Sequence, residues 1–411
     1  MNTDSRVVTL DVAVIGGGAA GFFAAIHAKN TTNTVAIFEK SAKLLSKVKI
    51  SGGGRCNVTN ACFDNELLSG YYPRGEKQLR RAFYQFNARS TVEWYESRGV
   101  KLKTYPDNCI FPQANDSQVI IDCLLKECYG RGVTLQVQHS VKAIRKENEI
   151  FILTLDEQLV YAKKVIVTTG GQPKMSGLKW LEELGLKIVP PVPSLFTFNM
   201  PGNPIRELMG NVVEQTTVKI EGTKLTGKGP LLITHWGMSG PAILQLSAWG
   251  ARILEEKKYR FSIFVNWLDE MKEEALRERL QRHKKEQPEK MLSNANPFSI
   301  TNKIWQFLLQ KYELPAQVRW KELEGKSLNK LITALLFDKY DVSGKTTFKE
   351  EFVTAGGVHL SEIDFNTMES KKINGLYFAG EVLDIDGITG GFNFQAAWTT
   401  GYIAGKHAGK D

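Results

Sequence analysis

The feature that most constrains this chain is the segment DVAVIGGGAAG at residues 11–21. Its apolar run at 12–15 is typical of a buried parallel strand. Gly16, Gly18 and Gly21 then have the spacing G-x-G-x-x-G. In that spacing the first glycine permits a tight turn, the second lets the backbone approach a pyrophosphate, and the third lets the next helix pack closely on the strand. The segment therefore predicts a strand–turn–helix unit that holds a dinucleotide.

The residues after the glycines complete this unit. A helix is expected over 19–29, and the amides of its first turn would point toward the phosphates. A second strand is expected over 34–38 and ends in Glu39, about 20 residues beyond the glycines, where an acid accepts the hydroxyls of an adenosine ribose. A carboxylate there disfavours a 2′-phosphate, so the site predicts FAD or NAD rather than NADP.

A second glycine-rich segment, SGGGRCN, occupies residues 51–57. Its three consecutive glycines permit backbone conformations that other residues disfavour, and such a loop can place its amides against a phosphate or a flavin edge. Lys47 and Arg55 flank the glycines and favour an anion cradle over a flexible connector. Cys56 is interpreted as a buried, unreactive thiol, because nothing in the sequence indicates a lowered pKa.

Two later strands also end beside glycines. The β-branched run at 164–169 is followed by Gly170 and Gly171, which offers a second place where backbone can approach a cofactor. A short strand expected at 376–379 ends at Gly380, and the glycine pair 390–391 then precedes a helix rich in small residues. The alternative for the C-terminal stretch is a packed strand–helix unit that binds no ligand.

Polar groups in the C-terminal stretch fit an elongated ligand. Glu381 or Asp386 could accept hydrogen bonds from polyol hydroxyls. The amides of Phe392 and Asn393 would lie at the start of the helix and could face a flavin carbonyl.

Composition narrows the remaining classes. The chain has 411 residues, of which 42% are hydrophobic and 24% charged, as expected for a globular protein of two or three domains. Its five cysteines are odd in number and form no CxxC pair, so neither a disulfide scaffold nor a metal site is expected. No apolar stretch precedes the first strand, and the uncharged run 229–251 contains prolines and polar groups. We therefore expect no signal peptide, no membrane span and a cytoplasmic location.

The net charge of +9 is compatible with a polyanionic partner. The best candidate surface is the stretch 71–89, which is basic and contains interleaved aromatic residues. Its aromatics recur at helical spacing, which favours a helix with one buried and one solvated face. A small-molecule substrate is expected rather than a nucleic acid, and the oligomeric state is not predicted.

Periodicity gives the coarse organisation. Helices are expected over 76–97 and 118–129, and strands over 134–144, 150–155, 159–162 and 164–169. Beyond the prolines at 190–193 the pattern changes to short alternating strands and then, from 268, to charged helices. The chain is expected to be α/β, with a Rossmann-like domain formed by 1–192 and 340–411, an inserted antiparallel β-barrel-like domain at 193–267 and a small helical domain at 268–339.

Six blocks together are typical of one family. They are VIGGGAAG at 14–21, KVKISGGGRCNVTN at 47–60, VTTGG at 167–171, THWGMSGPAIL at 234–244, VTAGGV at 353–358 and GLYFAGEVLDIDGITGGFNFQAAW at 375–398. With them the chain resembles the FAD-dependent flavoproteins with two dinucleotide-binding domains, most closely the group of bacterial aminoacetone oxidases and bile-acid-modifying BaiN-type reductases. One departure is SKVKI at 46–50, where relatives often carry a glycine or arginine before the lysine, and it leaves the local loop shape open.

The resemblance implies where FAD would lie. Its pyrophosphate would lie on residues 16–21, its ribose on Glu39 and its adenine near the backbone of Val141, while the isoalloxazine would meet the SGGGRCN loop and the helix start at 391–393. The strands from 195 would form a β-barrel domain, and the charged helices a third domain over the flavin. The residues that the motifs and the resemblance assign to the cofactor are Gly16, Gly18, Ala19, Ala20, Gly21, Glu39, Lys40, Lys47, Ser51, Gly52, Gly53, Gly54, Arg55, Cys56, Asn57, Val141, Thr169, Gly170, Gly171, Gly380, Glu381, Asp386, Gly391, Phe392 and Asn393.

The expected activity is flavin-mediated hydride transfer on a small organic substrate. Reduction of a carbon–carbon double bond with NAD(P)H as a transient donor and amine oxidation with O₂ both stay open, as does a non-catalytic flavin or nucleic-acid-associated binding protein. In the block THWGMSGPAIL, which is expected to close over the flavin side of the substrate cleft, His235 and Ser239 are the candidates for proton transfer. Ser239 is also expected to cap a helix that begins at Pro241.

Overall fold

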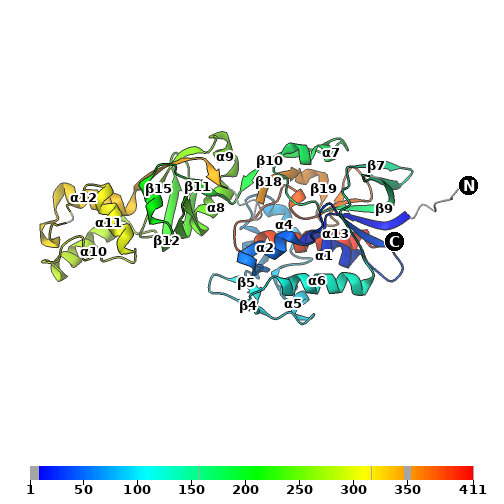
Figure 1. Cartoon of the computed structure of the whole chain (residues 1–411), viewed down its shortest axis with the longest axis horizontal. Helices are drawn as coiled ribbons and strands as arrows, with labels where there is room; N and C mark the ends of the chain where they lie inside the picture. Colours follow the sequence, from blue (N-terminus) through cyan, green and yellow to red (C-terminus); the bar gives the residue numbers. More distant parts are fainter. Residues whose placement is uncertain (1–8, 157, 316, 347–352, 411) are drawn as a thin grey trace, which may run out of the picture. The chain divides into compact units, whose positions relative to one another are not determined.

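The computed structural model describes residues 9–346 and 353–410, apart from residues 157 and 316. The chain forms two compact units (Figure 1): unit 1 contains residues 1–193 and 349–411, and unit 2 contains residues 194–348. Unit 2 is therefore an insertion within unit 1. The first eight residues, which bear on the expectation of no signal peptide, lie outside the described part. Each described helix is too short or too polar to cross a bilayer.

A mixed sheet forms the centre of unit 1. Its parallel strands have the order β6–β2–β1–β9–β21, and their bounds are Thr9–Ile15 (β1), Val35–Glu39 (β2), Thr134–Val137 (β6), Leu159–Val167 (β9) and Leu376–Phe378 (β21). The order in which strands are added reverses at β1, so the carboxyl ends of β1 and β9 form the switch point where open α/β sheets bind ligands. This arrangement confirms the expected Rossmann-type α/β fold.

The remaining elements of unit 1 surround this sheet. Short antiparallel strands extend it, namely β19 (Ile363–Asp364) and β20 (Glu369–Ser370) beyond β21, and the hairpin of β7 (Ala143–Glu147) and β8 (Ile150–Thr154) beside β9. The other elements are α2 (Ser46–Gly54), β3 (Thr59–Asn60), α3 (Asn65–Ser69), α4 (Glu76–Ala82), α5 (Ala88–Glu96), β4 (Leu102–Thr104), β5 (Cys109–Pro112), α6 (Gln118–Arg131), α7 (Lys179–Glu182), β10 (Ile188–Ser194) and β18 (Val353–Val358).

Two helices with small residues pack against each other beside the sheet (Figure 1). They are α1 (Ala19–Ala28) and α13 (Phe392–Ala408). A Cβ atom at Gly401, Gly405 or Gly409 would lie less than 3.0 Å from the carbonyl oxygen of Ala20, Ala24 or Ala28 respectively. Because both series rise by four residues, the helices run parallel, and their N-termini face the same end of unit 1.

Three local expectations were wrong. The helix expected over 76–97 is two helices, α4 and α5, because the side chain of Asn87 accepts a hydrogen bond from the Ser90 amide and starts a new helix. The strand expected over 134–144 is interrupted between β6 and β7, where Gln138 has a φ of 59°. The strands expected at 159–162 and 164–169 are one continuous strand, β9.

Unit 2 contains a seven-stranded antiparallel sheet. Its order is β16–β15–β12–β13–β14–β11–β17, and its strands are β11 (Thr197–Asn199), β12 (Val212–Ile220), β13 (Thr226–Ile233), β14 (Gly237–Ser239), β15 (Arg260–Asn266), β16 (Asp338–Ser343) and β17 (Lys345–Thr346). The first and last strands of this order are separated in the chain by Gly344 alone, so the sheet must curve back toward itself. No pairing between β16 and β17 is found among the described residues, so closure into a barrel stays an expectation.

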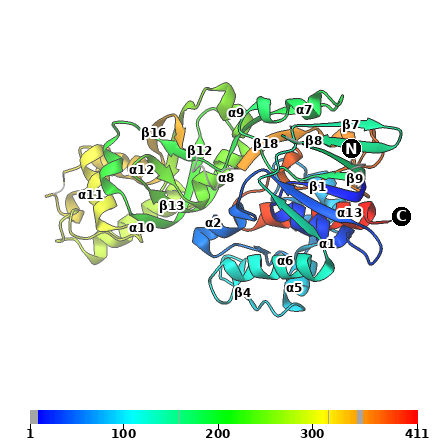
Figure 2. The ribbon, with the colours of Figure 1, turned by 45° about the vertical axis from the view of Figure 1, so that its right-hand side comes forward.

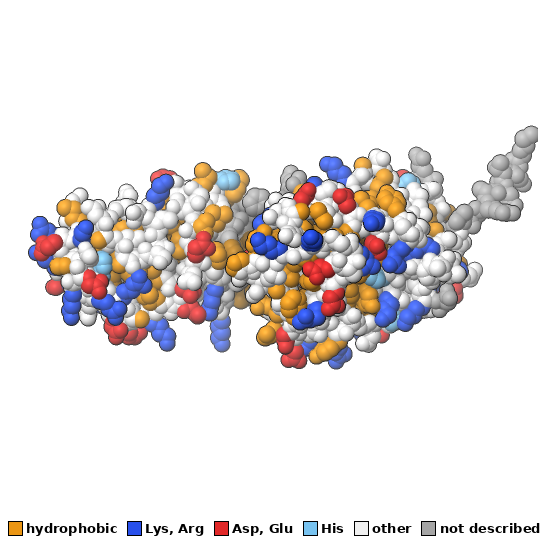
Figure 3. All heavy atoms as spheres, turned by 90° about the horizontal axis from the view of Figure 1, so that it is seen from below, with side chains coloured by type: hydrophobic (Ala, Val, Ile, Leu, Met, Phe, Trp, Pro, Cys, Tyr) orange, Lys and Arg blue, Asp and Glu red, His pale blue; other side chains and the backbone are white. Residues whose placement is uncertain are grey.

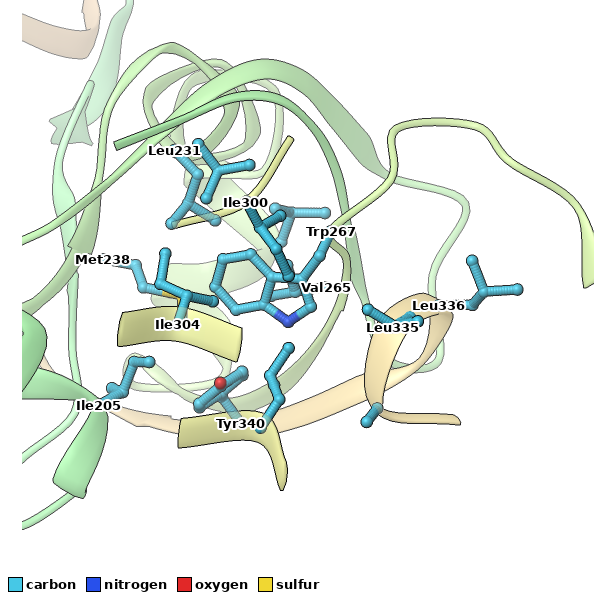
Figure 4. Close-up of a cluster of buried hydrophobic side chains, with 14 of the residues drawn as sticks. Ile205, Leu231, Met238, Val265, Trp267, Ile300, Ile304, Leu335, Leu336 and Tyr340 are labelled. Carbon is cyan, nitrogen blue, oxygen red and sulfur yellow. The ribbon is translucent and has the colours of Figure 1, made fainter. Parts of the chain in front are cut away.

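The helices of unit 2 share one core with this sheet. They are α8 (Pro241–Trp249), α9 (Ala251–Glu256), α10 (Glu273–Glu286), α11 (Asn302–Lys311) and α12 (Gly325–Leu336). Of the last three, α12 contacts β15 and β16, and both α10 and α11 contact α12 (Figure 2). Figure 4 shows Trp267 in the middle of this core, with Leu231 of β13, Ile304 of α11 and Tyr340 of β16 around it, and all four are buried. The division therefore differs from the expected one in two respects: 268–339 is not separate from the sheet, and β16 moves the end of the insertion from 339 to 348.

Candidate functional site

The glycine turn after β1 has the geometry that its spacing predicts. Gly16 has a φ of +112°, and a Cβ atom on it would lie less than 3.0 Å from the carbonyl oxygen of Thr168. A Cβ atom on Gly21 would collide with the carbonyl oxygen of Gly16, so only glycine lets α1 pack this closely. Gly18, by contrast, has no protein atom within 4 Å of its Cβ position. The turn and the close packing are thus confirmed, and the middle glycine faces open space.

Thr168 is a member of the site that the sequence analysis missed. Its hydroxyl donates to the carbonyl oxygens of Ile15 at 2.9 Å and Gly16 at 3.0 Å, and the residue is buried. It therefore fixes the glycine turn from the neighbouring strand end. Nothing in the β-branched run distinguishes it, because its partners lie about 150 residues earlier in the chain. The expected Gly170 follows at once with a φ of +71° and nothing within 4 Å of its Cβ position.

Glu39 ends β2 beside the glycine turn, as expected. One carboxylate oxygen accepts from the Gly17 amide at 2.8 Å, and the other accepts from the Ser41 amide at 2.8 Å. The Glu39 carbonyl accepts from the His139 amide at 2.9 Å, which brings the stretch leading to Val141 to the same sheet edge. A carboxylate has about four lone-pair sites, so Glu39 keeps acceptors for ribose hydroxyls.

The SGGGRCN loop adopts the backbone that only its glycines permit. Gly52, Gly53 and Gly54 have φ values of 58°, 69° and 83°, and they bend α2 at its end. No protein atom lies within 4 Å of the Cβ positions of Gly53 and Gly54, so their backbone faces open space. The guanidinium of Arg55 lies 4.4 Å from the ring centre of Phe111, and its Nε donates to the Gly52 carbonyl at 3.1 Å. Arg55 thus supports the loop as well as flanking it.

Side chains tie this loop to the C-terminal glycines. Asn60 Nδ2 donates to the carbonyl of Gly390 at 3.0 Å. Asn57, with its amide oriented to satisfy both groups, donates to the Thr59 carbonyl at 3.0 Å and accepts from the Gly391 amide at 3.1 Å. A Cβ atom on Gly391 would lie less than 3.0 Å from the Thr59 carbonyl oxygen, so this approach requires glycine. Two of the expected cofactor segments are thus one structural assembly.

A second assembly forms around Glu381. Its Oε2 accepts from Lys47 Nζ at 2.8 Å, and its Oε1 accepts from the amide and hydroxyl of Thr354 at 2.8 and 3.1 Å. A Cβ atom on Gly171 would lie less than 3.0 Å from Glu381 Oε1. Three expected residues therefore meet, and Thr354 joins them; it belongs to the block VTAGGV but was not among the residues assigned to the cofactor.

Asp386 has a different environment from Glu381. It is fully buried, and both of its oxygens accept from the guanidinium of Arg74 in a bidentate pair. Such a pair fixes the backbone around it. Asn393 makes a reciprocal pair with the backbone of Gly387, at 2.9 Å in both directions, and holds the same loop against the start of α13.

Both helices that face the glycine loops start without a side-chain cap. Gly18 is the N-cap of α1 and Gly391 that of α13, and neither provides a side-chain acceptor. The first-turn amides of a helix need partners from outside the helix, and an anion or carbonyl oxygen supplies them. The two helices run parallel, so these amides point to the same end of unit 1. This cradle fits an elongated dinucleotide.

The cysteine of the SGGGRCN loop is shielded from solvent. Cys56 is buried, and burial raises the pKa of its thiol to about 12, so it stays protonated at neutral pH. Its φ of 62° places it in the left-handed turn after the glycines. In the described part of the chain no group of three His, Cys, Asp or Glu side chains could hold a metal ion.

The candidate proton-transfer residues of unit 2 differ from each other. His235 is exposed, its ring lies 4.6 Å from that of Trp236, and its carbonyl accepts from Arg206 Nε at 2.6 Å. Ser239 is buried, and its hydroxyl accepts from Thr197 Oγ1 at 3.0 Å. The expectation that Ser239 caps α8 was wrong, because Gly240 with a φ of +89° is the N-cap; Pro241 does open the helix, as predicted.

Comparisons with known proteins agree with this reading of unit 1. The family model described as HI0933-like protein Rossmann domain matches residues 10–407. A 3-dehydro-bile acid Δ4,6-reductase of Clostridium scindens is 28% identical over 411 residues, which cover 97% of this chain and 98% of that protein. A ribosomal RNA dihydrouridine synthase of Escherichia coli K12 is 28% identical over 405 residues, covering 96% of this chain and 97% of that protein.

Solved structures show the same fold at lower identity. The 3-ketosteroid-Δ4-(5α)-dehydrogenase of Rhodococcus jostii RHA1 has a TM-score of 0.54 at 13% identity, with 100% of this chain and 99% of that chain covered. The 3-ketosteroid Δ1-dehydrogenase of Sterolibacterium denitrificans has a TM-score of 0.52 at 12% identity, with 98% and 99% covered. At these identities the likeness concerns the fold alone.

Proposed function

The chain belongs to the HI0933-like protein Rossmann domain family, and from that premise we propose that it is an FAD-dependent reductase of carbon–carbon double bonds. Flavin-mediated oxidoreduction is the activity that the family and the reductase relatives support together. The names of two relatives share one reaction class, in which hydrogen is added across a carbon–carbon double bond. The observation that carries the proposal is the cradle of unit 1, where glycine turns and two uncapped helix starts face one end.

Different residues of the cradle would bind different parts of FAD. The open backbone at Gly18 would receive the pyrophosphate, and Glu39 the adenosine ribose. The loop at 52–54 and the α13 start would meet the isoalloxazine. Bound FAD supplies hydride exchange between a donor and the substrate. NAD(P)H is the donor that we propose, docking transiently.

His235 is the proposed proton donor. Addition of hydride to one carbon of the double bond leaves negative charge that a proton must quench at the other carbon. His235 is exposed and its ring nitrogens have no partner within the described residues, whereas the Ser239 hydroxyl is buried and engaged. A His235→Ala variant should lower substrate turnover and leave flavin reduction by NAD(P)H unchanged. Equal rates of both half-reactions in variant and wild type would make His235 structural.

The substrate class has two candidates. A small molecule with a ketone conjugated to the double bond is one, by similarity to the bile acid reductase. A uracil base in RNA is the other, because the relatives from Escherichia coli and Haemophilus influenzae are named for ribosomal RNA. The sequence-based expectation of no nucleic-acid partner is thereby reopened.

An anaerobic titration tests the proposal. The purified protein should show the absorption spectrum of oxidised FAD, and NADH or NADPH should bleach it. A conjugated ketosteroid or a uridine-containing RNA should then restore the spectrum without O₂. Bleaching by an amine, with reoxidation only by O₂, would instead establish the amine oxidase that the sequence left open. A colourless protein that retains its fold would reject both.

A further inference from the structure

A basic cavity lies on unit 1 away from the glycine turn of β1. It has a volume of about 610 Å³ and lies between α4 and the segment 360–371. Four cationic side chains line it, from Lys77, Arg80, Arg81 and Lys371, against one carboxylate, that of Asp364. Its size is that of a site for a small molecule or a segment of a larger one.

The cations of the cavity are only partly neutralised. Lys77 and Arg81 are exposed, and their side chains form no ion pair with any described residue. Arg80 lies 3.7 Å from both Glu66 and Glu76, a distance at which exposed pairs contribute little. The Lys371 ammonium donates to the Ser361 carbonyl at 3.0 Å and keeps its charge unpaired. The cavity therefore has excess positive charge and favours an anion.

The net charge of the chain alone would not identify this place. Figure 3 shows basic and acidic side chains intermixed over the face that it displays. The cavity differs from the rest of the surface because four cationic side chains line the same concave site. Gln85 Nε2 donates to the Asn366 carbonyl at 3.0 Å and joins the chain after α4 to the opposite side of the cavity.

The chain segment 71–76 leads from the start of α13 to α4, which lines the cavity. Tyr71, which is 39% exposed, stacks on Phe392 at the start of α13 with ring centres 4.5 Å apart. Arg74 follows, bound to Asp386, and α4 begins two residues later. The seven residues of α4 span about 10 Å, which is of the order of one or two nucleotides. Tyr84, 73% exposed, lies at the far end.

We propose that this cavity binds the phosphate backbone of an RNA strand whose base reaches the flavin. Proteins bind single-stranded nucleic acids with cationic side chains that contact the phosphates and exposed aromatic side chains on which the bases stack. The stretch 71–89 contributes both to the core and to the exposed surface. Its buried aromatic residues are Tyr72, Phe83 and Phe86. Its exposed aromatic and basic residues are Tyr71, Lys77, Arg81 and Tyr84. The inference rests on the proposed function only for the reaction that follows binding.

Charge reversal in the cavity tests the inference. Fluorescence anisotropy would measure the affinity of wild type and of the double variant Lys77→Glu/Arg81→Glu for a labelled single-stranded oligouridylate. The variant should bind on the order of tenfold more weakly, and the slope of log Kd against log salt should fall by about 1.4, since each phosphate contact on a single strand contributes about 0.7. The neutral pair Lys77→Gln/Arg81→Gln should be intermediate.

A matched control separates the cavity from overall charge. Lys101→Glu/Lys126→Glu makes the same charge change at exposed positions of unit 1 outside the cavity, and it should leave affinity unchanged. FAD content and the thermal midpoint would report on folding. Equal RNA affinity of the cavity variant and the control variant would overturn the inference, and so would a loss of NADPH affinity with RNA affinity intact. RNA binding that depends on the cavity, in a protein that reduces no substrate, would uphold the inference and reject the proposed function.

Discussion

Two glycines of one motif have opposite reasons to be glycine. Gly18 has extended backbone angles, φ −93° and ψ −171°, and open space at its Cβ position, so the fold tolerates a side chain there. Gly21 has no such room. We expect Gly18→Val to fold normally and to lose FAD, because the side chain would occupy the position proposed for the pyrophosphate. Gly21→Ala should lose about 1–3 kcal/mol of stability through overpacking. Absorbance and thermal unfolding check the pair, and normal FAD content in folded Gly18→Val would place the pyrophosphate elsewhere.

Cys56 shows how burial alone decides the role of a residue. Its pKa of about 12 in the folded state lies above the ordinary value of 9.0. The folded state therefore holds the proton more tightly, and the stability that this provides is fully present below pH 9 and is lost as the pH rises toward 12. We expect Cys56→Ser to keep FAD, to keep turnover within about tenfold, and to show a shallower fall in the free energy of unfolding above pH 9. Abolished flavin reduction with FAD retained would reveal a redox thiol instead.

At the scale of elements, sequence patterns predicted what is local. Glycine spacing and apolar runs predicted β1, α1 and β2, whereas the order of the strands in the sheet became known only from the structure. The break between α4 and α5 was not predicted, because the buried Phe83 and Phe86 continue the helical spacing of apolar residues across it. The Asn87 side chain nevertheless caps a new helix at this point. The roles of Thr168 and Thr354 were not predictable, because each depends on a tertiary contact. Thr168 contacts the end of β1 about 150 residues earlier in the chain, and Thr354 contacts Glu381, which follows β21.

The contact between α1 and α13 should be sensitive to a single methyl group. At Gly405 a Cβ atom would lie less than 3.0 Å from the backbone of Ala24, whereas at Gly130, also in a helix, no atom lies within 4 Å. We expect Gly405→Ala to lower the free energy of unfolding by about 1–3 kcal/mol and to lower FAD affinity, because α1 carries the proposed pyrophosphate site. Gly130→Ala should be neutral or stabilising by up to about 1 kcal/mol. Denaturant unfolding compares the two variants. Equal effects would mean that α1 and α13 can move apart to accommodate the methyl group, so that their close contact is not needed for stability.

At the scale of the molecule, the insertion leaves unit 1 with the whole proposed cradle. Every residue expected to bind FAD lies outside 194–348, whereas His235 and Ser239 lie within it. The chain enters and leaves unit 2 through paired strands, since Thr197 lies opposite Thr346 in the sheet. Insertions with adjacent ends often fold independently. The prolines at 190–193 predicted where the insertion starts. Its end was not predicted, because no sequence pattern shows that β16 pairs with β15 of the inserted sheet rather than with the sheet of unit 1.

Two fragments test where the insertion ends. The fragment 194–348 contains the complete sheet and the core around Trp267, so it should show the circular dichroism of the folded unit and unfold cooperatively. The fragment 193–339 lacks most of β16, which pairs with β15 from Arg260 to Val265 and carries the buried Tyr340. Loss of that strand exposes a sheet edge and opens the core, and we expect this fragment to unfold without cooperativity or to aggregate. Similar cooperative melting of both fragments would show that β16 is dispensable and would restore the earlier boundary. Failure of 194–348 to fold would show that the unit depends on the rest of the chain, although its core is its own.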